Sequence, residues 1–191
     1  MLSLSFWGDI LAKQYTIEDA FEVEKNDEIL FISIQPRFSE LIRKGIKTVE
    51  LRKRMPKKNC KIAIVYESAP IMKATFLIKI KRIEAKSKKV VWEKYSKQCA
   101  ISKKHFDEYY NGSKESIAIV LGKIIPLQKS LTRKKLVSLG LIPPQDYRYA
   151  QPMNIPNFKY CLKKIIPQTS HLHLFIKCIY IVFTWQNVWY L

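Results

Sequence analysis

The sequence has few glycines, cysteines, histidines and acidic residues for its 191 positions. It contains five glycines, four cysteines, three histidines and 16 acidic residues, against 34 lysines and arginines. No glycine-rich loop that would cradle a phosphate occurs, and no two cysteines stand close enough for a Cys-x-x-Cys metal or redox motif. These absences argue against a loop-type nucleotide-binding fold and a zinc ribbon. We therefore predict neither a metal nor a cofactor.

The cysteines and the N-terminal residues bear on location. Cys60, Cys99, Cys161 and Cys178 are few and irregularly spaced, which favours reduced thiols over a disulfide framework. Residues 1–7 lack the basic start of a signal peptide. A cytoplasmic location is therefore predicted.

Positive charge is concentrated in the middle of the chain. The formal net charge is +18, and residues 30–150 alone carry 28 basic and nine acidic side chains. Residues 1–29 carry two basic and seven acidic side chains, whereas residues 151–191 carry four basic and none acidic. We therefore divide the chain into an acidic N-terminal extension (1–28), a basic domain (29–150) and an apolar C-terminal tail (151–191). An imbalance of this size usually indicates a polyanionic partner.

Periodicity predicts alternating strands and helices over the basic domain. Apolar or alternating runs predict strands at 29–34, 47–52, 61–66, 73–83 and 116–125. Helices are predicted from Pro36 to a glycine stop at Gly45, over 90–97, after Ser102, and from Thr132 to Gly140. This order predicts an α+β fold, a small and mostly antiparallel β-barrel with flanking helices.

The strand predicted over 47–52 alternates cleanly. Val49 and Leu51 point one way, and Thr48, Glu50 and Arg52 point the other. The polar face is expected to line solvent or a cleft.

These residues also carry a resemblance to a known family. Ile34-Gln35-Pro36 and the run from Gly45 to Arg52 resemble the signature of ASCH domains, which belong to the PUA-like superfamily. Later segments in the same order resemble further blocks of that family: 66–70, 106–122 and 143–147. The resemblance covers residues 30–150 and implies a PUA-like barrel with a cleft beside it. It also implies RNA binding, with a role in RNA metabolism or transcription-related regulation.

Some ASCH domains resembling this one are small enzymes, either ribonucleases or amidohydrolases that act on acetylated cytidine. The resemblance implies that their lysine corresponds to Lys47. The amidohydrolase threonine position is Glu50 here, and Gln98-Cys99-Ala100 stands near the expected downstream glutamate. These departures argue against amidohydrolase activity. Hydrolysis of RNA or of a modified nucleoside is kept as the alternative function, with Lys47 and Glu50 as candidate catalytic residues. An ion pair between Glu50 and Arg52 is the structural interpretation of the same residues.

Nine lysines and arginines fall within the nineteen positions 43–61, where Glu50 is the only acid. Lysine and arginine bind phosphates without reading sequence, so this cluster predicts a partner that is RNA or another nucleic acid. A solvated basic surface is the alternative interpretation. The residues predicted to bind nucleic acid are Lys47, Thr48, Arg52, Arg54, Lys57, Tyr66 and Ser68.

The tail is open to two interpretations. Residues 171–191 are largely apolar and long enough to cross a bilayer. Lys177, Gln186 and Asn187 weaken a membrane anchor, and the aromatic and β-branched residues also suit strands packed on the domain.

Overall fold

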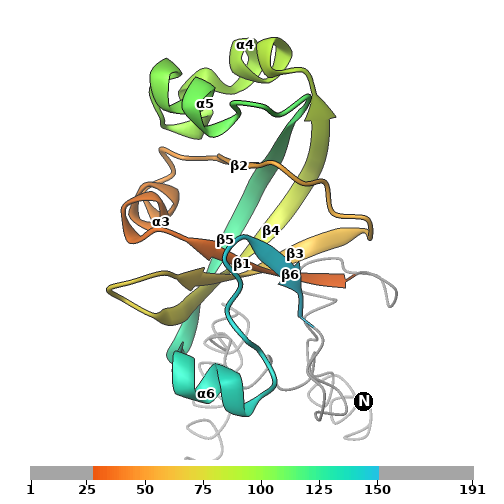
Figure 1. Cartoon of the computed structure of the whole chain (residues 1–191). Coiled ribbons are helices and arrows are strands. Elements are labelled where there is room, and N and C mark those ends of the chain that lie inside the picture. Colours follow the sequence, from red (N-terminus) through yellow and green to blue (C-terminus); the bar gives the residue numbers. More distant parts are fainter. Residues whose placement is uncertain (1–27, 151–191) are drawn as a thin grey trace, which may run out of the picture.

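A six-stranded β-sheet organises the computed structural model, which describes residues 28–150 (Figure 1). Its strands lie in the order β2-β5-β4-β3-β1-β6. Their bounds are β1 Glu28–Ile34, β2 Val49–Arg52, β3 Cys60–Glu67, β4 Lys73–Lys86, β5 Ser116–Thr132 and β6 Tyr147–Tyr149. β1 pairs with β3 in parallel, whereas the other four pairings are antiparallel. The sheet is therefore mixed. It curls into a half-barrel, which confirms the α+β class, and closure into a full barrel stays a prediction.

Between residues 28 and 150, four helices connect the strands, with bounds α3 Pro36–Arg43, α4 Lys88–Cys99, α5 Lys103–Tyr109 and α6 Arg133–Ser138. Two predicted N-caps are confirmed, since the hydroxyl of Ser102 accepts from the His105 amide and that of Thr132 from the Lys135 amide. Figure 1 shows α4 and α5 together at one end of the long strands β4 and β5, and α6 at the other end. These three helices therefore lie at the two ends of the long strands, whose middle parts contribute Phe76, Leu77 and Ile78 to the core.

Strand β1 divides the core because its side chains alternate between two faces. Leu30 and Ile32 join a cluster inside the curl of the sheet, whereas Ile29 and Phe31 join a cluster on the other face, which Leu136 of α6 covers. A third cluster lies where α4 and α5 pack on β2 and β5: Val49, Leu51, Val91, Tyr95, Cys99, Phe106, Tyr110, Ala118 and Val120. β1 is thus buried on both faces, which explains its uninterrupted apolar run.

The sequence under-predicted the sheet in two ways. Strands β4 and β5 extend beyond 83 and 125, and they pair from Lys73–Thr132 to Lys86–Ser116 with several register shifts. The extensions are rich in polar residues, so pairing rather than hydrophobic pattern holds them in the sheet. β6 was missed because it has only three residues and is held in the sheet by its pairing with β1, which leaves no pattern in the sequence.

Both ends of the described chain lie at one edge of the domain. The amide of Glu28 donates to the carbonyl of Asn59 (2.8 Å), and the amide of Ala150 donates to the carbonyl of Ile29 (2.8 Å). Glu28, assigned from the sequence to the N-terminal extension, belongs to β1. The rest of that extension and the predicted tail, including 171–191, lie outside the described residues. Between residues 28 and 150, none of the helices has the length and apolar character that crossing a membrane requires.

Gly45 ends α3 as predicted and gives a test of this local structure. Its φ is +72°, and Gly45 and Ile46 donate their amides to the carbonyls of Ile42 and Leu41, which is a Schellman motif. A Cβ at Gly45 would meet no atom within 4 Å, so the cost of Gly45→Ala is purely conformational. We expect this substitution to lower the free energy of unfolding by about 1 to 2 kcal/mol in urea titrations.

Gly45→Asn is the matched control because asparagine tolerates the left-handed conformation better than alanine. It should lose less stability than Gly45→Ala. Equal stability of the alanine variant and the wild type would contradict the capping role.

Candidate functional site

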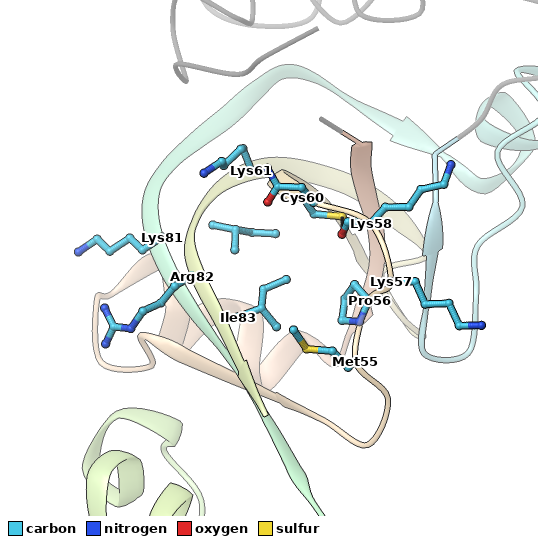
Figure 2. A pocket seen from close by; sticks show the side chains of 11 residues that line it. Met55, Pro56, Lys57, Lys58, Cys60, Lys61, Lys81, Arg82 and Ile83 are labelled. Carbon is cyan, nitrogen blue, oxygen red and sulfur yellow. Dashed lines mark hydrogen bonds between the residues drawn. The ribbon is translucent and has the colours of Figure 1, made fainter. Parts of the chain in front are cut away.

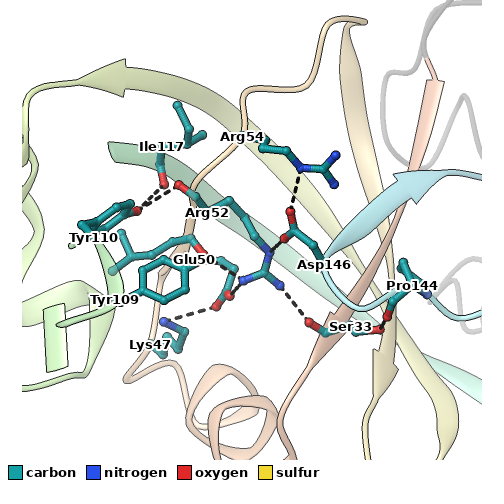
Figure 3. A network of polar contacts seen from close by, with 11 residues as sticks. Ser33, Lys47, Glu50, Arg52, Arg54, Tyr109, Tyr110, Ile117, Pro144 and Asp146 are labelled. Carbon is teal, nitrogen blue, oxygen red and sulfur yellow. Dashed lines mark hydrogen bonds and ion pairs between the residues drawn. The ribbon is translucent and has the colours of Figure 1, made fainter. Parts of the chain in front are cut away.

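Four charged side chains meet at strand β2 in a network that we call the ion network: Lys47, Glu50, Arg52 and Asp146 (Figure 3). Glu50 lies between two cations, with Lys47 Nζ 3.2 Å from its Oε2 and the Arg52 guanidinium at its Oε1. Arg52 Nε lies 2.8 Å from Asp146 Oδ1. The side chains of Lys47, Glu50 and Arg52 are only 3%, 8% and 9% exposed. Three of its members are therefore buried and Asp146 is partly exposed, and the two cations are balanced by two carboxylates.

The turn after α3 places Lys47 in this network. The Schellman motif carries the chain from α3 toward β2, and Lys47 follows it directly. Lys47 Nζ donates to the carbonyls of Val49 (2.9 Å) and Cys99 (2.7 Å) and lies 5.1 Å from the centre of the Phe38 ring. All of its donors are therefore directed into the protein.

Arg52 ties β2 to distant parts of the chain. Its guanidinium donates to the carbonyls of Leu51 and Ser33, each at 2.8 Å, in addition to its two ion pairs. Asp146 also accepts from Arg54 Nε at 3.3 Å, so one carboxylate bridges the buried Arg52 and the exposed Arg54. Asp146 comes directly before β6 and is therefore placed by the pairing of β6 with β1.

Electrostatics keep the central groups charged. Burial alone would raise the pKa of Glu50, but the charges of Lys47 and Arg52 outweigh it and hold that pKa below its usual value. Burial likewise acts to lower the pKa of Arg52, and the nearby Glu50, Tyr109 and Asp146 reverse this effect and raise it. Glu50 is thus a carboxylate held by ion pairs, which is the opposite of a carboxyl whose pKa is raised for proton transfer.

The polar face of β2 was expected to line solvent or a cleft, and its burial contradicts exposure to solvent. Alternation predicted that Glu50 and Arg52 point away from Val49 and Leu51, yet all four residues of β2 are buried. The reason is that Asp146 and the Tyr109 side chain from α5 lie against this polar face (Figure 3). Thr48 is half-buried, and its backbone bonds Gln98 and Leu121.

The exposed cations lie in the next segment, residues 53–59, which we call the basic loop. It contains Lys53, Arg54, Lys57 and Lys58 and no acid, and all four side chains are exposed. The amides of Lys57 and Lys58 donate to the Tyr149 hydroxyl at 2.7 and 3.0 Å. The loop is therefore anchored through its backbone, which leaves its cationic side chains at the surface.

Three tyrosines accompany these cations. Lys53 Nζ lies 5.1 Å from the Tyr109 ring centre, the Arg54 guanidinium 5.1 Å from that of Tyr147, and Lys58 Nζ 5.2 Å from that of Tyr149. Such distances are those of cation–π contacts. The sequence analysis missed these tyrosines and Asp146 as site residues, although Asp146 and Tyr147 stand in the closing segment that carries the family resemblance.

The remaining predicted residues lie elsewhere. Tyr66 is buried in the core and packs edge-on against Phe31, with ring centres 6.2 Å apart. Ser68 follows the end of β3 opposite to the one that the basic loop enters. The structure therefore brings Lys47, Glu50 and Arg52 together and links Arg54 to them through Asp146. Lys57 lies farther along the basic loop, and Tyr66 and Ser68 lie apart from this group. No group of three or more His, Cys, Asp or Glu side chains within 28–150 is arranged to hold a metal ion.

Comparisons with known proteins identify the family of this chain. A family model described as "Domain of unknown function (DUF365)" matches residues 34–141, more than half of the chain. The chain belongs to the DUF365 family. The crystal structure of ASCH from Zymomonas mobilis superposes with a TM-score of 0.63 at 20% identity, covering 75% of this chain and 99% of that chain. The predicted membership of the ASCH domain family is confirmed.

Two curated relatives resemble the ASCH domain in sequence. An ASCH domain-containing ribonuclease from Zymomonas mobilis is 26% identical over 117 residues, which are 60% of this chain and 79% of the relative. A large ribosomal subunit protein uL22 from Ureaplasma parvum is 31% identical over 101 residues, which are 52% of this chain. That match spans only 32% of the ribosomal protein, so the similarity concerns one part of it.

The ion network gives a stability prediction. Glu50→Gln keeps the shape of the side chain but leaves Lys47 and Arg52 buried with one carboxylate fewer. Breaking a buried pair in this way costs about 3 to 5 kcal/mol, so we expect a large drop in the free energy of unfolding measured by urea titration.

Glu40→Gln is the control, since Glu40 pairs with Lys44 at the exposed surface of α3 (2.6 Å). Exposed pairs contribute little, so this variant should unfold close to the wild type. If Glu50→Gln were as stable as Glu40→Gln, the network would not hold the fold together.

Proposed function

We propose that the ASCH domain binds RNA in single-stranded form, through the basic loop and the tyrosines beside it. The proposal rests on one observation: the acidic side chain of this region is buried, whereas the basic side chains that follow β2 are exposed. The acid of this region, Glu50, is turned inward, whereas Lys53, Arg54 and Lys57 remain at the surface. Exposed cations of this kind neutralise phosphates, and they do so independently of base sequence.

The tyrosines supply a second part of the interface. Tyr109 is exposed, and Tyr147 and Tyr149 are half-buried next to the loop cations. Unpaired bases stack on aromatic rings and on arginine side chains, whereas the bases of a duplex are already stacked on one another. This favours single-stranded RNA over double-stranded RNA as the ligand.

The burial of Lys47 and Arg52 changes which residues the proposal needs. Their charges are engaged inside the protein, so we assign the phosphate contacts to Arg54 and Lys57 and a positioning role to the ion network. Asp146 connects the two, because it holds Arg52 on one side and Arg54 on the other. One relative carries the word ribonuclease in its name, which supports a function related to RNA.

Fluorescence anisotropy with an unstructured RNA at low and moderate salt tests the proposal. We expect salt-sensitive binding, and the Arg54→Ala/Lys57→Ala double variant should bind more weakly to all sequences. Its log–log salt slope should fall by about 1.4, since each single-strand phosphate contact contributes about 0.7.

Lys129→Ala is the matched control, because Lys129 is an exposed lysine of β5 near the end of that strand opposite to the part that pairs with β2. It should leave both affinity and salt slope unchanged. An absence of RNA binding at low salt, or a double variant that binds like the wild type, would contradict the proposal.

Hydrolysis of RNA is the second candidate function. It is favoured by the ribonuclease name of the relative and by the pairing of Lys47 with Glu50 at the position where the family resemblance implies a catalytic lysine. Both side chains are buried, so cleavage requires that the cover formed by Tyr109 and Asp146 opens to admit a phosphate.

A cleavage assay with end-labelled RNA distinguishes this candidate from binding alone. If Lys47 stabilises the cleaved phosphate, Lys47→Met should lower the rate about a hundredfold, the typical effect of removing one such donor. Lys104→Met, on the exposed surface of α5, should retain full activity. Cleavage that persists in a folded Lys47→Met protein, checked by circular dichroism, would indicate a contaminating nuclease.

A further inference from the structure

A separate pocket opens inside the curl of the sheet, between the basic loop and β4 (Figure 2). It has a volume of about 260 Å³, and neither Lys47 nor Glu50 lines it. Its apolar lining consists of Met55, Pro56, Ile80 and Ile83, and Cys60 lies among them with its thiol directed at the carbonyl of Lys58. Ile80 and Cys60 belong to the inner core cluster, so the pocket reaches the interior of the half-barrel.

The rim of the pocket is cationic. Five basic side chains surround the opening, and no acidic residue lines it: Lys57, Lys58, Lys61, Lys81 and Arg82. Lys58 pairs with Glu28 and Arg82 with Glu84, whereas no described carboxylate pairs with Lys57, Lys61 or Lys81. Figure 2 shows Lys61 and Lys81 on one side of the opening and Lys57 and Lys58 on the other. The ammonium groups extend outward, and their flexible stems let them close over an anion.

The shape of β4 produces this opening. The pairing of β4 with β5 shifts register between Ile78 and Ile80 and again between Ile80 and Arg82. Gly122 lies against this irregular stretch, where a Cβ would come within 3.1 Å of the Lys79 carbonyl. Irregularities of this kind re-aim side chains at the rims of curled sheets and next to binding sites. Here they direct Lys81 and Arg82 to the rim while Ile80 remains buried.

The chemistry of the pocket selects its ligand. About 260 Å³ lies just below the usual range for small-molecule sites, which suits a compact ligand larger than a bare phosphate. The apolar side chains of the lining can contact the face of a base, and the rim lysines with which no described carboxylate pairs can bind a phosphate. We infer that the pocket binds a nucleoside monophosphate, either free or as the 5′-phosphorylated end of an RNA strand. The inference rests on the proposed RNA binding only where the ligand is the 5′-phosphorylated end of an RNA strand. Binding of the free nucleotide does not depend on it.

Isothermal titration with AMP, UMP and the matching unphosphorylated nucleosides tests this inference. We expect both monophosphates to bind and the nucleosides to bind at least about tenfold more weakly, since they lack the charge-assisted hydrogen bonds. Lys61→Met/Lys81→Met should reduce monophosphate affinity by a similar factor. Lys89→Met/Lys104→Met, which removes two exposed lysines from α4 and α5, should leave it unchanged.

Affinities for short RNAs with and without a 5′-phosphate distinguish the two possible ligands, the free nucleotide and the strand end. Tighter binding of the phosphorylated strand, reversed by AMP, identifies the strand end. AMP binding with no difference between the two strands identifies the free nucleotide. Equal affinity for nucleoside and monophosphate, or no effect of Lys61→Met/Lys81→Met, would overturn the inference.

The unphosphorylated RNA also keeps the two hypotheses distinguishable. If it binds through Arg54 and Lys57 while AMP does not bind, the pocket assignment fails and the proposed function stands. If AMP binds and this RNA does not, the pocket assignment stands and the proposed function fails.

Discussion

The position of Glu50 between Lys47 and Arg52 is the constraint on which the described domain depends. A buried cation is tolerated only when an opposite charge and further hydrogen bonds surround it. Lys47 meets this condition through Glu50 and two carbonyls, and Arg52 through Glu50, Asp146 and two carbonyls. These partners come from the end of α4, from β1, from β2 and from the residue before β6. The network therefore fixes the position of β2, a four-residue strand that pairs only with β5 among the described strands.

The same network explains how one basic sequence yields two environments. Arg52 of β2 and Lys47, just before that strand, are buried and neutralised, whereas the cations of the basic loop stay at the surface, three of them next to tyrosines. Asp146 stands at the boundary, with Arg52 inside and Arg54 outside. A phosphate that approaches the loop would compete with Asp146 for Arg54. The surface and the interior are thus coupled through a single, partly exposed carboxylate, which is why we assign the ion network a positioning role.

The sequence predicted the features whose causes are local. Gly45, Ser102 and Thr132 mark helix ends through backbone conformation and side-chain capping, and the run from Ile29 to Ile34 marks a strand buried on both faces. The burial of the polar face of β2 is caused by residues distant in the sequence, so its exposure to solvent was predicted wrongly. Alternation told which residues share a face, but the burial of that face depends on Asp146 and Tyr109. β6 is likewise held by its partner, and three residues give too short a pattern to detect.

The parallel pairing of β1 with β3 has a consequence for whatever is joined to the domain. It brings Glu28 to the start of β3, and the pairing of β6 brings Ala150 to the same edge. The chain therefore enters and leaves the described domain beside the basic loop, the surface to which we assign RNA binding.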